Sequence, residues 1–140
     1  MGRHYTPRLD YFTDAEGRRL VRVPVNGSDT PAITEAALFD NAASRYGLTG
    51  SLYLSGDGRG HRYVMASVPG SGTHRTLARL LLLQPKSYRI RYRDGDPFNL
   101  LPENLRLSAP WADKDTAAAA LAVHLDHARQ RPEVGNGAQA

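Results

Sequence analysis

The alternation of hydrophobic and polar positions predicts the first strand of the chain. Residues 20–25 read Leu, Val, Arg, Val, Pro and Val, the pattern of a short, half-buried strand. Pro24 favours an edge position for this strand, since proline has no N–H to donate to a neighbouring strand. The segment NGSDTP that follows predicts a loop. Thr34 is placed to cap a helix over 35–46, where apolar residues recur at helical spacing, and Gly47 is suited to end that helix.

Two strands and two turns are predicted in the middle of the chain. Residues 51–55 and 61–68 flank the turn sequence GDGRG and predict a hairpin, and PGSGTH after them predicts a second turn. Residues 76–83 are apolar apart from Arg79. So short an apolar run fits either a strand or a helix, and periodicity does not decide between the two.

The clearest strand covers residues 87–93, whose side chains alternate between two faces. One face carries Tyr88, Ile90 and Tyr92, and the other carries Arg89, Arg91 and Arg93. Successive side chains on one face of a strand lie about 6.6 Å apart, close to the spacing of phosphates along a strand of nucleic acid. The three arginines therefore predict a phosphate-binding stripe, although a solvated sheet face would show the same pattern.

The last third of the chain predicts a turn, a short helix, an extended segment and a long helix. In the turn DGDP we expect Gly95 to have a positive φ. Pro102 is suited to open a short helix, and 105–107 to extend again. A helix from about Asp113 to Arg131 is acidic at its start and basic at its end, with an apolar stripe of Leu121, Leu125 and Ala128. Trp111 is expected to pack this helix onto the core.

The chain of 140 residues, with 41% hydrophobic and 23% charged residues, predicts one folded domain. We expect an N-terminal extension (1–19), an α+β domain (20–110), a C-terminal helix packed on it (111–131) and a flexible tail (132–140). The absence of cysteine excludes disulfides, thiolate metal sites and cysteine nucleophiles. No run approaches the roughly 18 apolar residues of a membrane span, and the amino terminus does not resemble a signal peptide. These features predict a cytoplasmic protein with no membrane partner.

The formal net charge of +4 is concentrated in the middle of the chain. Residues 57–106 contain nine basic residues against four acidic ones, whereas the segments before and after are close to neutral. Clustered positive charge is typical of surfaces that bind the phosphates of nucleic acids. His61 and His74 flank turns and lack a carboxylate at ligand spacing. His124 and His127, three apart on a helix, could ligate zinc in principle, but with no second pair they favour a solvated face.

The segment IRYRDGDPFNLLPENLRL, residues 90–107, resembles the core of HNH-family endonucleases, the ββα-metal or His-Me finger fold. In that family a strand ending in Asp-His is followed by a glycine-containing turn, an Asp-Asn or Asn-Asn pair and a Glu-Asn-Leu-Arg helix. The turn is matched by 95–97, the paired position by Asn99 and Leu100, and the helix by 102–106. Upstream, 63–64 and 77–81 are similar to elements of phage-type HNH proteins, many of which carry a plant ERF-type (Apetala-like) DNA-binding module.

The departures from the family pattern concern its chemistry. Family nucleases cut phosphodiesters with one divalent cation, held partly by the strand's Asp, while the adjacent His deprotonates water. Arg91 and Tyr92 stand at those two positions, and Ala78 stands where the upstream element has a histidine. Arginine cannot ligate a cation, and tyrosine, with an ordinary pKa near 10, is a poor base. Asn104 is retained at the position of the helical metal ligand.

The resemblance and its departures together predict an α+β protein with a small antiparallel sheet and a degenerate ββα-metal core. We expect a pseudo-nuclease that binds double-stranded DNA without cutting it and without a cofactor, as a phage-related or bacterial transcription regulator or accessory factor. The residues expected to contact DNA are Arg75, Arg79, Arg89, Arg91, Arg93 and Arg106.

Two alternatives remain open from the sequence. The first is a residual nuclease that recruits a divalent cation such as Mg²⁺ through His74, Asp94, Asp96 and Asn104. The second is a protein-interaction module whose alanine-rich C-terminal helix mediates a homodimer or holds a protein partner. The sequence also leaves open whether the nucleic acid is DNA or RNA.

Overall fold

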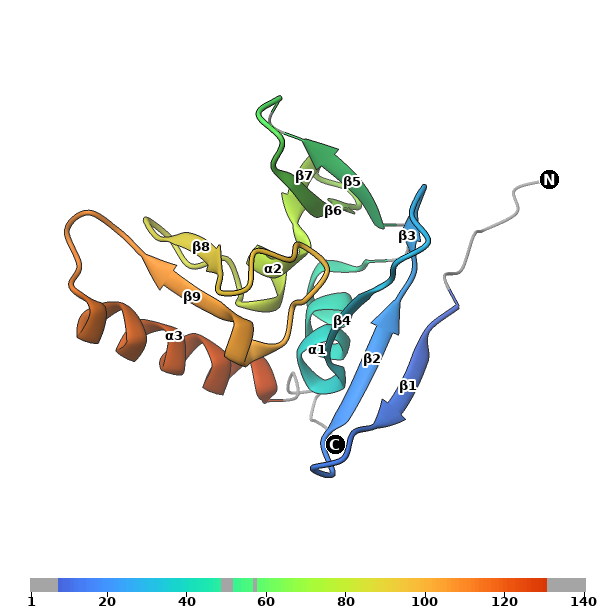
Figure 1. The fold of residues 1–140 in the computed structure, drawn as a ribbon, viewed down its shortest axis with the longest axis horizontal. Coiled ribbons are helices and arrows are strands. Elements are labelled where there is room, and N and C mark those ends of the chain that lie inside the picture. The colour runs from blue at the N-terminus through green and yellow to red at the C-terminus, as the bar shows by residue number, and fades with distance from the viewer. Residues whose placement is uncertain (1–7, 49–51, 57, 131–140) are drawn as a thin grey trace.

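The computed structural model describes residues 8–48, 52–56 and 58–130, which form an α+β fold of three small sheets and three helices (Figure 1). The strands are β1 (Asp10–Thr13), β2 (Arg19–Val23), β3 (Val25–Asn26), β4 (Ala32–Glu35), β5 (Leu52–Gly56), β6 (Arg62–Val68), β7 (Thr73–Thr76), β8 (Arg89–Tyr92) and β9 (Leu105–Ser108). The helices are α1 (Ala36–Tyr46), α2 (Leu77–Leu81) and α3 (Lys114–Arg129), with a 3-10 helix η1 (Pro102–Asn104) before β9.

The sheets are small and mostly antiparallel. The first has the strand order β1-β2-β4, and the second has the order β3-β5-β6-β7, in which β3 and β5 run parallel. The third is a two-stranded antiparallel ribbon of β8 and β9. A two-stranded ribbon is marginal by itself, and here α3 runs along β9 and packs against it (Figure 1). The position of the ribbon therefore depends on the C-terminal helix.

The core lies where α1 and α2 meet the sheets. Leu38 of α1 and Leu77 and Leu80 of α2 are fully buried, together with Val21 of β2 and Leu105 of β9. The ambiguous apolar run 76–83 thus contains the short helix α2, which is buried on nearly all sides, and this explains why the run shows no amphipathic period. The Thr76 side chain caps α2 by accepting a hydrogen bond from the backbone N–H of Arg79 at 3.2 Å.

The predicted C-terminal helix is confirmed as α3, but the role predicted for Trp111 is wrong. Asp113 caps the helix by accepting a hydrogen bond from the Thr116 N–H at 2.7 Å, and Ala117 and Ala128 are its buried residues. Trp111 is 62% exposed, and its ring lies 5.0 Å from that of Tyr88. A tight turn, closed by the bond from the Ala112 N–H to the Ala109 carbonyl, keeps the indole outside the core.

Two expectations for the N-terminal half are also wrong. β2 is central, between β1 and β4, because Pro24 follows its last residue and does not interrupt the ladder. Thr34 is not a helix cap: it lies in β4, and its hydroxyl donates to the carbonyl of Leu100 at 2.8 Å. The helix begins two residues later and ends at Gly47, whose φ of 66° confirms the predicted left-handed end.

Other boundaries shift without changing the architecture. The hairpin of β5 and β6 is confirmed, and residues 10–13 of the predicted extension form the edge strand β1. The second turn is shorter than expected, because β7 begins at Thr73 and pairs with β6. The predicted tail 132–140 lies outside the described residues. Among the described helices, none combines the length and the apolar character needed to cross a membrane.

Candidate nucleic-acid interface

The ribbon of β8 and β9 presents arginines on one face and apolar side chains on the other. Arg89 and Arg91 are exposed, whereas Ile90 and Tyr92 pack against the hydrophobic core, which confirms the predicted alternation. Arg106 of β9 is also exposed and lies directly opposite Arg91 in the strand register. Like charges at directly opposed positions of a sheet destabilise it. The ribbon therefore concentrates positive charge at some cost to its own stability.

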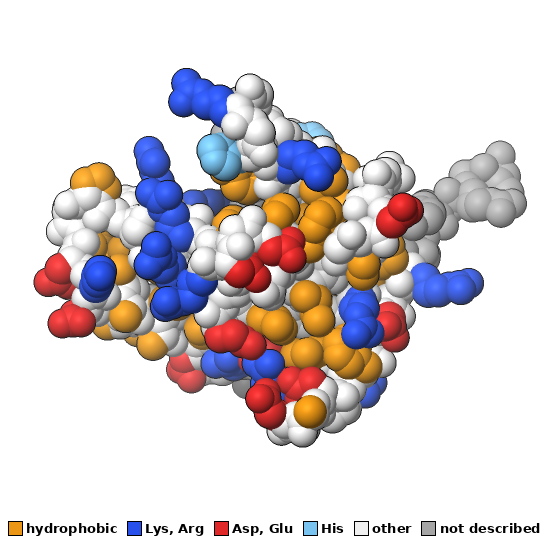
Figure 2. All heavy atoms as spheres, viewed as in Figure 1, with side chains coloured by type: hydrophobic (Ala, Val, Ile, Leu, Met, Phe, Trp, Pro, Cys, Tyr) orange, Lys and Arg blue, Asp and Glu red, His pale blue; other side chains and the backbone are white. Residues whose placement is uncertain are grey.

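These arginines line a cleft of about 860 Å³ between the ribbon, the start of β6 and α2. Arg62 of β6 and Arg79 of α2 approach the cleft from the other side, and Tyr63 and Tyr92 lie between them, with ring centroids 6.2 Å apart. None of the described lining residues is acidic. In the space-filling view, basic side chains gather in a band over β8 and β9 (Figure 2). The cleft thus combines cationic walls with aromatic surface.

The arginines that open into the cleft are not neutralised within the described part of the chain. The ion pairs of Arg18, Arg22 and Arg129 all lie outside the cleft. Arg62, Arg89 and Arg106 have no acidic partner among the described residues, and Arg91 donates from Nε to the Ser108 hydroxyl at 3.3 Å. Their charge is available to an anion from solution.

Arg79 has a different role from the other cleft arginines. Its guanidinium donates to the backbone carbonyls of Pro85 at 2.6 Å and Tyr88 at 2.9 Å, and the side chain is partly buried. These bonds fix the loop that leads from α2 into β8, where Leu83, Gln84 and Ser87 have positive φ. Arg79 is therefore a positioning residue for β8, since two of its donors are already used by the fold.

Two further predicted DNA contacts lie outside the cleft lining. Arg75 is exposed on β7 and donates to the His74 carbonyl at 3.1 Å. Arg93 is exposed just after β8, and its backbone N–H donates to the Asn104 carbonyl at 2.8 Å. The structure therefore brings together Arg79, Arg89, Arg91 and Arg106 of the predicted set, and places Arg75 and Arg93 at its periphery.

The turn that joins β8 to η1 is held by Asn104, which is buried. Its carbonyl oxygen accepts from the backbone N–H of Asp94 at 2.9 Å, and its amide donates to the Asp94 carboxylate at 2.9 Å and the Asn99 carbonyl at 2.8 Å. Gly95, with φ of 76°, makes the turn as predicted. The side chain of Asn104 is thus engaged by hydrogen bonds within the turn.

The Asp94 carboxylate is likewise used to close this turn. It accepts from the Asp96 backbone N–H at 2.8 Å and from the amides of Asn99 and Asn104, each at 2.9 Å. These hydrogen bonds, that of the Asp96 N–H first, hold the pKa of Asp94 below its usual range. The carboxylate is therefore ionised at neutral pH, with its oxygens committed to local backbone and amide donors.

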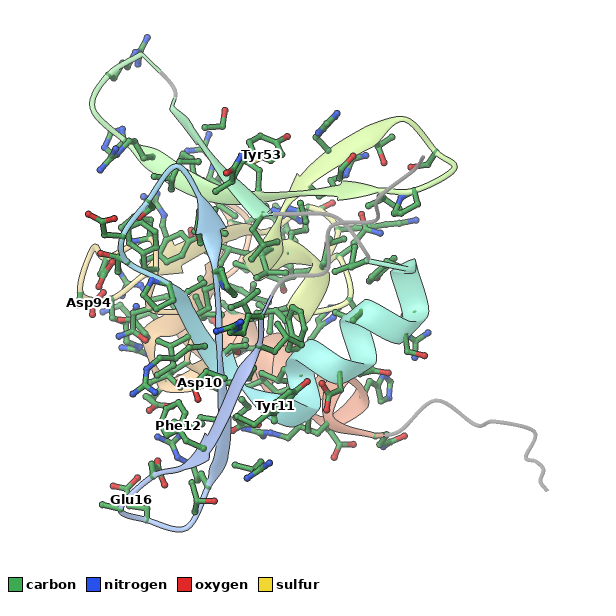
Figure 3. The ribbon with its side chains drawn as sticks, turned by 90° about the vertical axis from the view of Figure 1, so that its right-hand side faces the viewer. Asp10, Tyr11, Phe12, Glu16, Tyr53 and Asp94 are labelled. Carbon is green, nitrogen blue, oxygen red and sulfur yellow. The ribbon has the colours of Figure 1, made fainter. Side chains whose placement is uncertain are left out.

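Of the residues considered for a residual nuclease, Asp94, Asp96 and Asn104 lie together at the ribbon turn, but His74 does not join them. His74 bonds through Nδ1 to the Tyr53 hydroxyl at 2.5 Å on the β5–β7 sheet, while Asp94 lies at the ribbon turn, well separated from Tyr53 (Figure 3). Across the described ranges, no group of three or more His, Asp or Glu side chains is arranged to hold a metal ion. Burial, followed by the neighbouring Tyr63, raises the pKa of Tyr92 to about 12. Tyr92 therefore stays protonated at neutral pH.

Sequence reasoning missed Arg62 and Tyr63 as members of the site. Arg62 belongs to the basic middle segment, but its position at the start of a predicted strand gives no reason to place it beside β8. The two strands belong to different sheets, and their neighbourhood depends on how α2 and its following loop turn the chain. The sequence signal that could have placed these residues in one site is an arginine directly followed by a tyrosine, which occurs in both Arg62-Tyr63 and Arg91-Tyr92.

Comparison of the chain with protein-family models, with curated protein sequences and with solved structures gave no match.

Proposed function

We propose that the protein binds DNA through the arginine cleft without cutting it. The observation that carries this proposal is the convergence of Arg62, Arg89, Arg91 and Arg106 on one cleft, with no acidic partner among the described residues. Arginine presents a planar fork of donors that matches the oxygens of a phosphate, and it keeps its charge at any physiological pH. A phosphodiester backbone, with regularly spaced charges, is the ligand that such a set of donors fits best.

The cross-strand pair of Arg91 and Arg106 adds to this argument. The two side chains emerge directly opposite each other from β8 and β9, so their mutual repulsion opposes folding. An anion placed between them turns this repulsion into two attractive contacts. Binding of phosphate therefore stabilises the ribbon as well as the complex, to an extent that grows with the ratio of ligand concentration to dissociation constant.

The resemblance to HNH nucleases supports the same function and the absence of cleavage. In the segment that resembles the family core, the turn at Gly95 follows β8 and the short helix η1 follows that turn, although Leu105 and Arg106 extend into β9 instead of continuing the helix. At the positions that carry the metal ligand and the base in that family, this chain has Arg91 and Tyr92, of which the first repels a cation and the second is held protonated. A pseudo-nuclease with double-stranded DNA as its partner is the function that these features favour.

Binding is tested by fluorescence anisotropy with a labelled duplex at a series of salt concentrations. Each phosphate contact contributes about −0.9 to the slope of log K against log salt, so four contacts predict a slope of roughly −3.6. The variants Arg89→Ala, Arg91→Ala and Arg106→Ala should each weaken binding and flatten the slope by about one unit. Arg45→Ala, which removes an exposed arginine of α1 outside the cleft, is the matched control. Equal effects of all four substitutions would contradict the assignment of the cleft.

Cleavage is tested with supercoiled plasmid in the presence of Mg²⁺ or Mn²⁺. We expect no nicking above a protein-free control. Metal-dependent nicking that is lost in both Asp94→Ala and His74→Ala would replace the proposal with the residual nuclease.

A further inference from the structure

We propose that the arginine cleft accepts an unpaired stretch of the nucleic acid, with a base against Tyr63 and Tyr92 and the flanking phosphates on the arginines. This inference rests on the proposed function and deepens it: within the DNA partner, the part that the cleft takes up is an unpaired end or stretch. The observation behind it is that the aromatic and the cationic residues line the same concave site. A phosphate-binding surface for a continuous duplex has no need of the aromatic part.

The composition of the cleft matches the requirements of an unpaired nucleotide. Proteins that bind single strands combine a positively charged groove, which follows the backbone, with aromatic side chains on which bases stack. Here Arg89, Arg91 and Arg106 form one wall, and the contacting rings of Tyr63 and Tyr92 connect that wall to β6. Pro97 and Ile90 add further apolar surface to the lining.

The shape of the site favours an unpaired nucleotide over a continuous double helix. In a duplex the bases stack on each other inside a convex cylinder, and only phosphates and groove edges reach a protein. The cleft is a partly open groove, and its volume of about 860 Å³ is large enough to take up a nucleotide. A nucleotide that is free of its pairing partner can place its base in such a site, whereas a paired base cannot.

Tyr63 is the residue on which this inference depends most. It is half-buried on β6, contacts Tyr92, and stands next to Arg62, which lines the same cleft. Tyr63 pairs with Ser55 across the hairpin in the backbone ladder. Truncation of the Tyr63 side chain therefore leaves the backbone ladder of β5 and β6 in place. The change to Phe keeps the ring and removes the hydroxyl alone. Tyr63→Ala and Tyr63→Phe therefore separate a stacking role from a polar one.

The test compares three labelled probes of the same sequence: a single strand of about 12 nucleotides, the blunt duplex, and the duplex with a short 3′ overhang. We expect the wild-type protein to bind the single-stranded and overhang probes more tightly than the blunt duplex. The preference should widen as salt rises, because the phosphate contacts weaken with salt while stacking does not. Tyr63→Ala should weaken binding of the two unpaired probes by about 5- to 150-fold, a larger loss than for the blunt duplex, and Tyr63→Phe should bind like wild type.

The outcomes separate this inference from the proposed function. If Arg91→Ala and Arg106→Ala bind every probe as wild type does, the cleft is not a nucleic-acid site and both proposals fail. If the arginine variants lose affinity but the three probes bind equally, and Tyr63→Ala changes nothing, the cleft binds backbone alone and only the present inference is overturned. Thermal unfolding of Tyr63→Ala, compared with that of wild type, shows whether the variant is folded.

A second measurement uses the unmodified protein, so that it does not depend on the folding of any variant. A single strand with one 5-iodouracil, irradiated in complex with the protein, forms a covalent bond to an aromatic side chain that touches the base. We expect the crosslinked peptide to contain Tyr63 or Tyr92. A crosslink confined to Trp111, which is exposed outside the cleft lining, would overturn the inference.

Discussion

The arginines of this protein fall into two groups that differ in their partners. In the first group, Arg18 contacts Asp14 at 2.9 Å and Glu103 at 3.0 Å, and Arg129 contacts Glu35 at 2.8 Å. The second group lines the cleft, and Arg89 and Arg106 there have no acidic partner among the residues described. The same side chain therefore serves two purposes, and the presence of a carboxylate within reach distinguishes them.

The paired group connects elements that are distant in the sequence. Arg18, in the turn after β1, holds Glu103 of η1 through two parallel hydrogen bonds, and Arg129 at the end of α3 holds Glu35 before α1 in the same way. The charge of these two arginines stabilises the fold, whereas the cleft arginines have no such partner among the described residues.

The substitution with the largest expected effect is Arg91→Glu. It places a carboxylate in the cleft, where phosphate is expected to bind, so DNA affinity should fall by more than about 100-fold, since like-charge contacts cost several kcal/mol. The fold should not suffer, because the introduced carboxylate would face Arg106 across the ribbon and replace a repulsion with an attraction worth about 0.2–1 kcal/mol. Anisotropy and thermal unfolding measure the two effects.

The matched control for this prediction is Arg22→Glu, which changes the net charge equally in the paired group. It breaks the contact with Asp10 at 2.9 Å and should lower stability slightly while retaining most of the DNA affinity. If the two variants lose affinity to the same extent, net charge and not the cleft governs binding.

Asn104→Ala should cause the largest loss of stability. The substitution leaves the Asp94 N–H and the Asn99 carbonyl without their partners in a partly buried turn, and each orphaned group costs about 1–3 kcal/mol where water does not replace the partner. We expect the free energy of unfolding to fall by roughly 3 kcal/mol, measured by urea denaturation. Asn99→Ala removes the side-chain bond to Asp94 and the long bond from the Leu101 N–H at 3.3 Å, and it should cost less because Asn99 is less buried than Asn104. Equal costs would show that Asn104 does not hold the turn.

The alkaline limit of stability should depend on Tyr92. Burial raises its pKa from the ordinary 10 to about 12, so the folded state binds the phenolic proton more tightly than the unfolded state does. The stability gained in this way is complete below pH 10 and is lost as the pH rises toward 12. Tyr92→Phe removes the ionisable group, and unfolding curves in this range should become less dependent on pH. If the pH dependence of stability is unchanged in this variant, it belongs to Tyr11. The pKa of Tyr11 is also raised to about 12, by burial and by the hydrogen bond to Asp40.

The smallest effect is expected in the paired group. Arg18→Ala should lower the free energy of unfolding by about 1 kcal/mol or less, because the contacts are partly exposed, and should leave DNA affinity unchanged. The Arg18 side chain holds the pKa of Glu103 below its usual range, so this contribution is present at neutral pH and lost in acid. The difference between wild type and variant should therefore shrink as the pH falls below about 4. A difference that persists in acid would point to packing of the Arg18 stem.

Local patterns predict the parts of the fold that depend on local physics. The alternation of 87–93 predicts the two faces of β8, and Gly47 and Gly95 have the positive φ that their positions indicate. The cap predicted at Thr34 is wrong because the partner of its hydroxyl is the carbonyl of Leu100, 66 residues away, and no local pattern reports such a contact. The run that forms α2 is ambiguous in the sequence because a helix that is buried on nearly all sides has no amphipathic period.

The candidate site is predictable in part for a related reason. Arg89, Arg91 and Arg106 belong to one ribbon, so their common face follows from strand alternation and the turn between them. Arg62 and Tyr63 come from another sheet, and only the packing of α2 brings them to the ribbon. The DNA contact predicted for Arg79 rests on charge alone, which does not reveal that backbone carbonyls occupy its guanidinium. The resemblance to HNH nucleases and the DNA partner stay predictions.

The loop that Arg79 fixes also marks where this protein can be made more heat-resistant. Leu83, Gln84 and Ser87 have φ of 58°, 53° and 67°, a left-handed conformation that costs a residue with a Cβ roughly 1–2 kcal/mol. Ser87 is exposed and its side chain is not needed for the cleft lining. Replacement of Ser87 by glycine would relieve this conformational cost directly before β8. Thermostability and ligand recognition can therefore be engineered independently, even though the loop and the cleft adjoin each other.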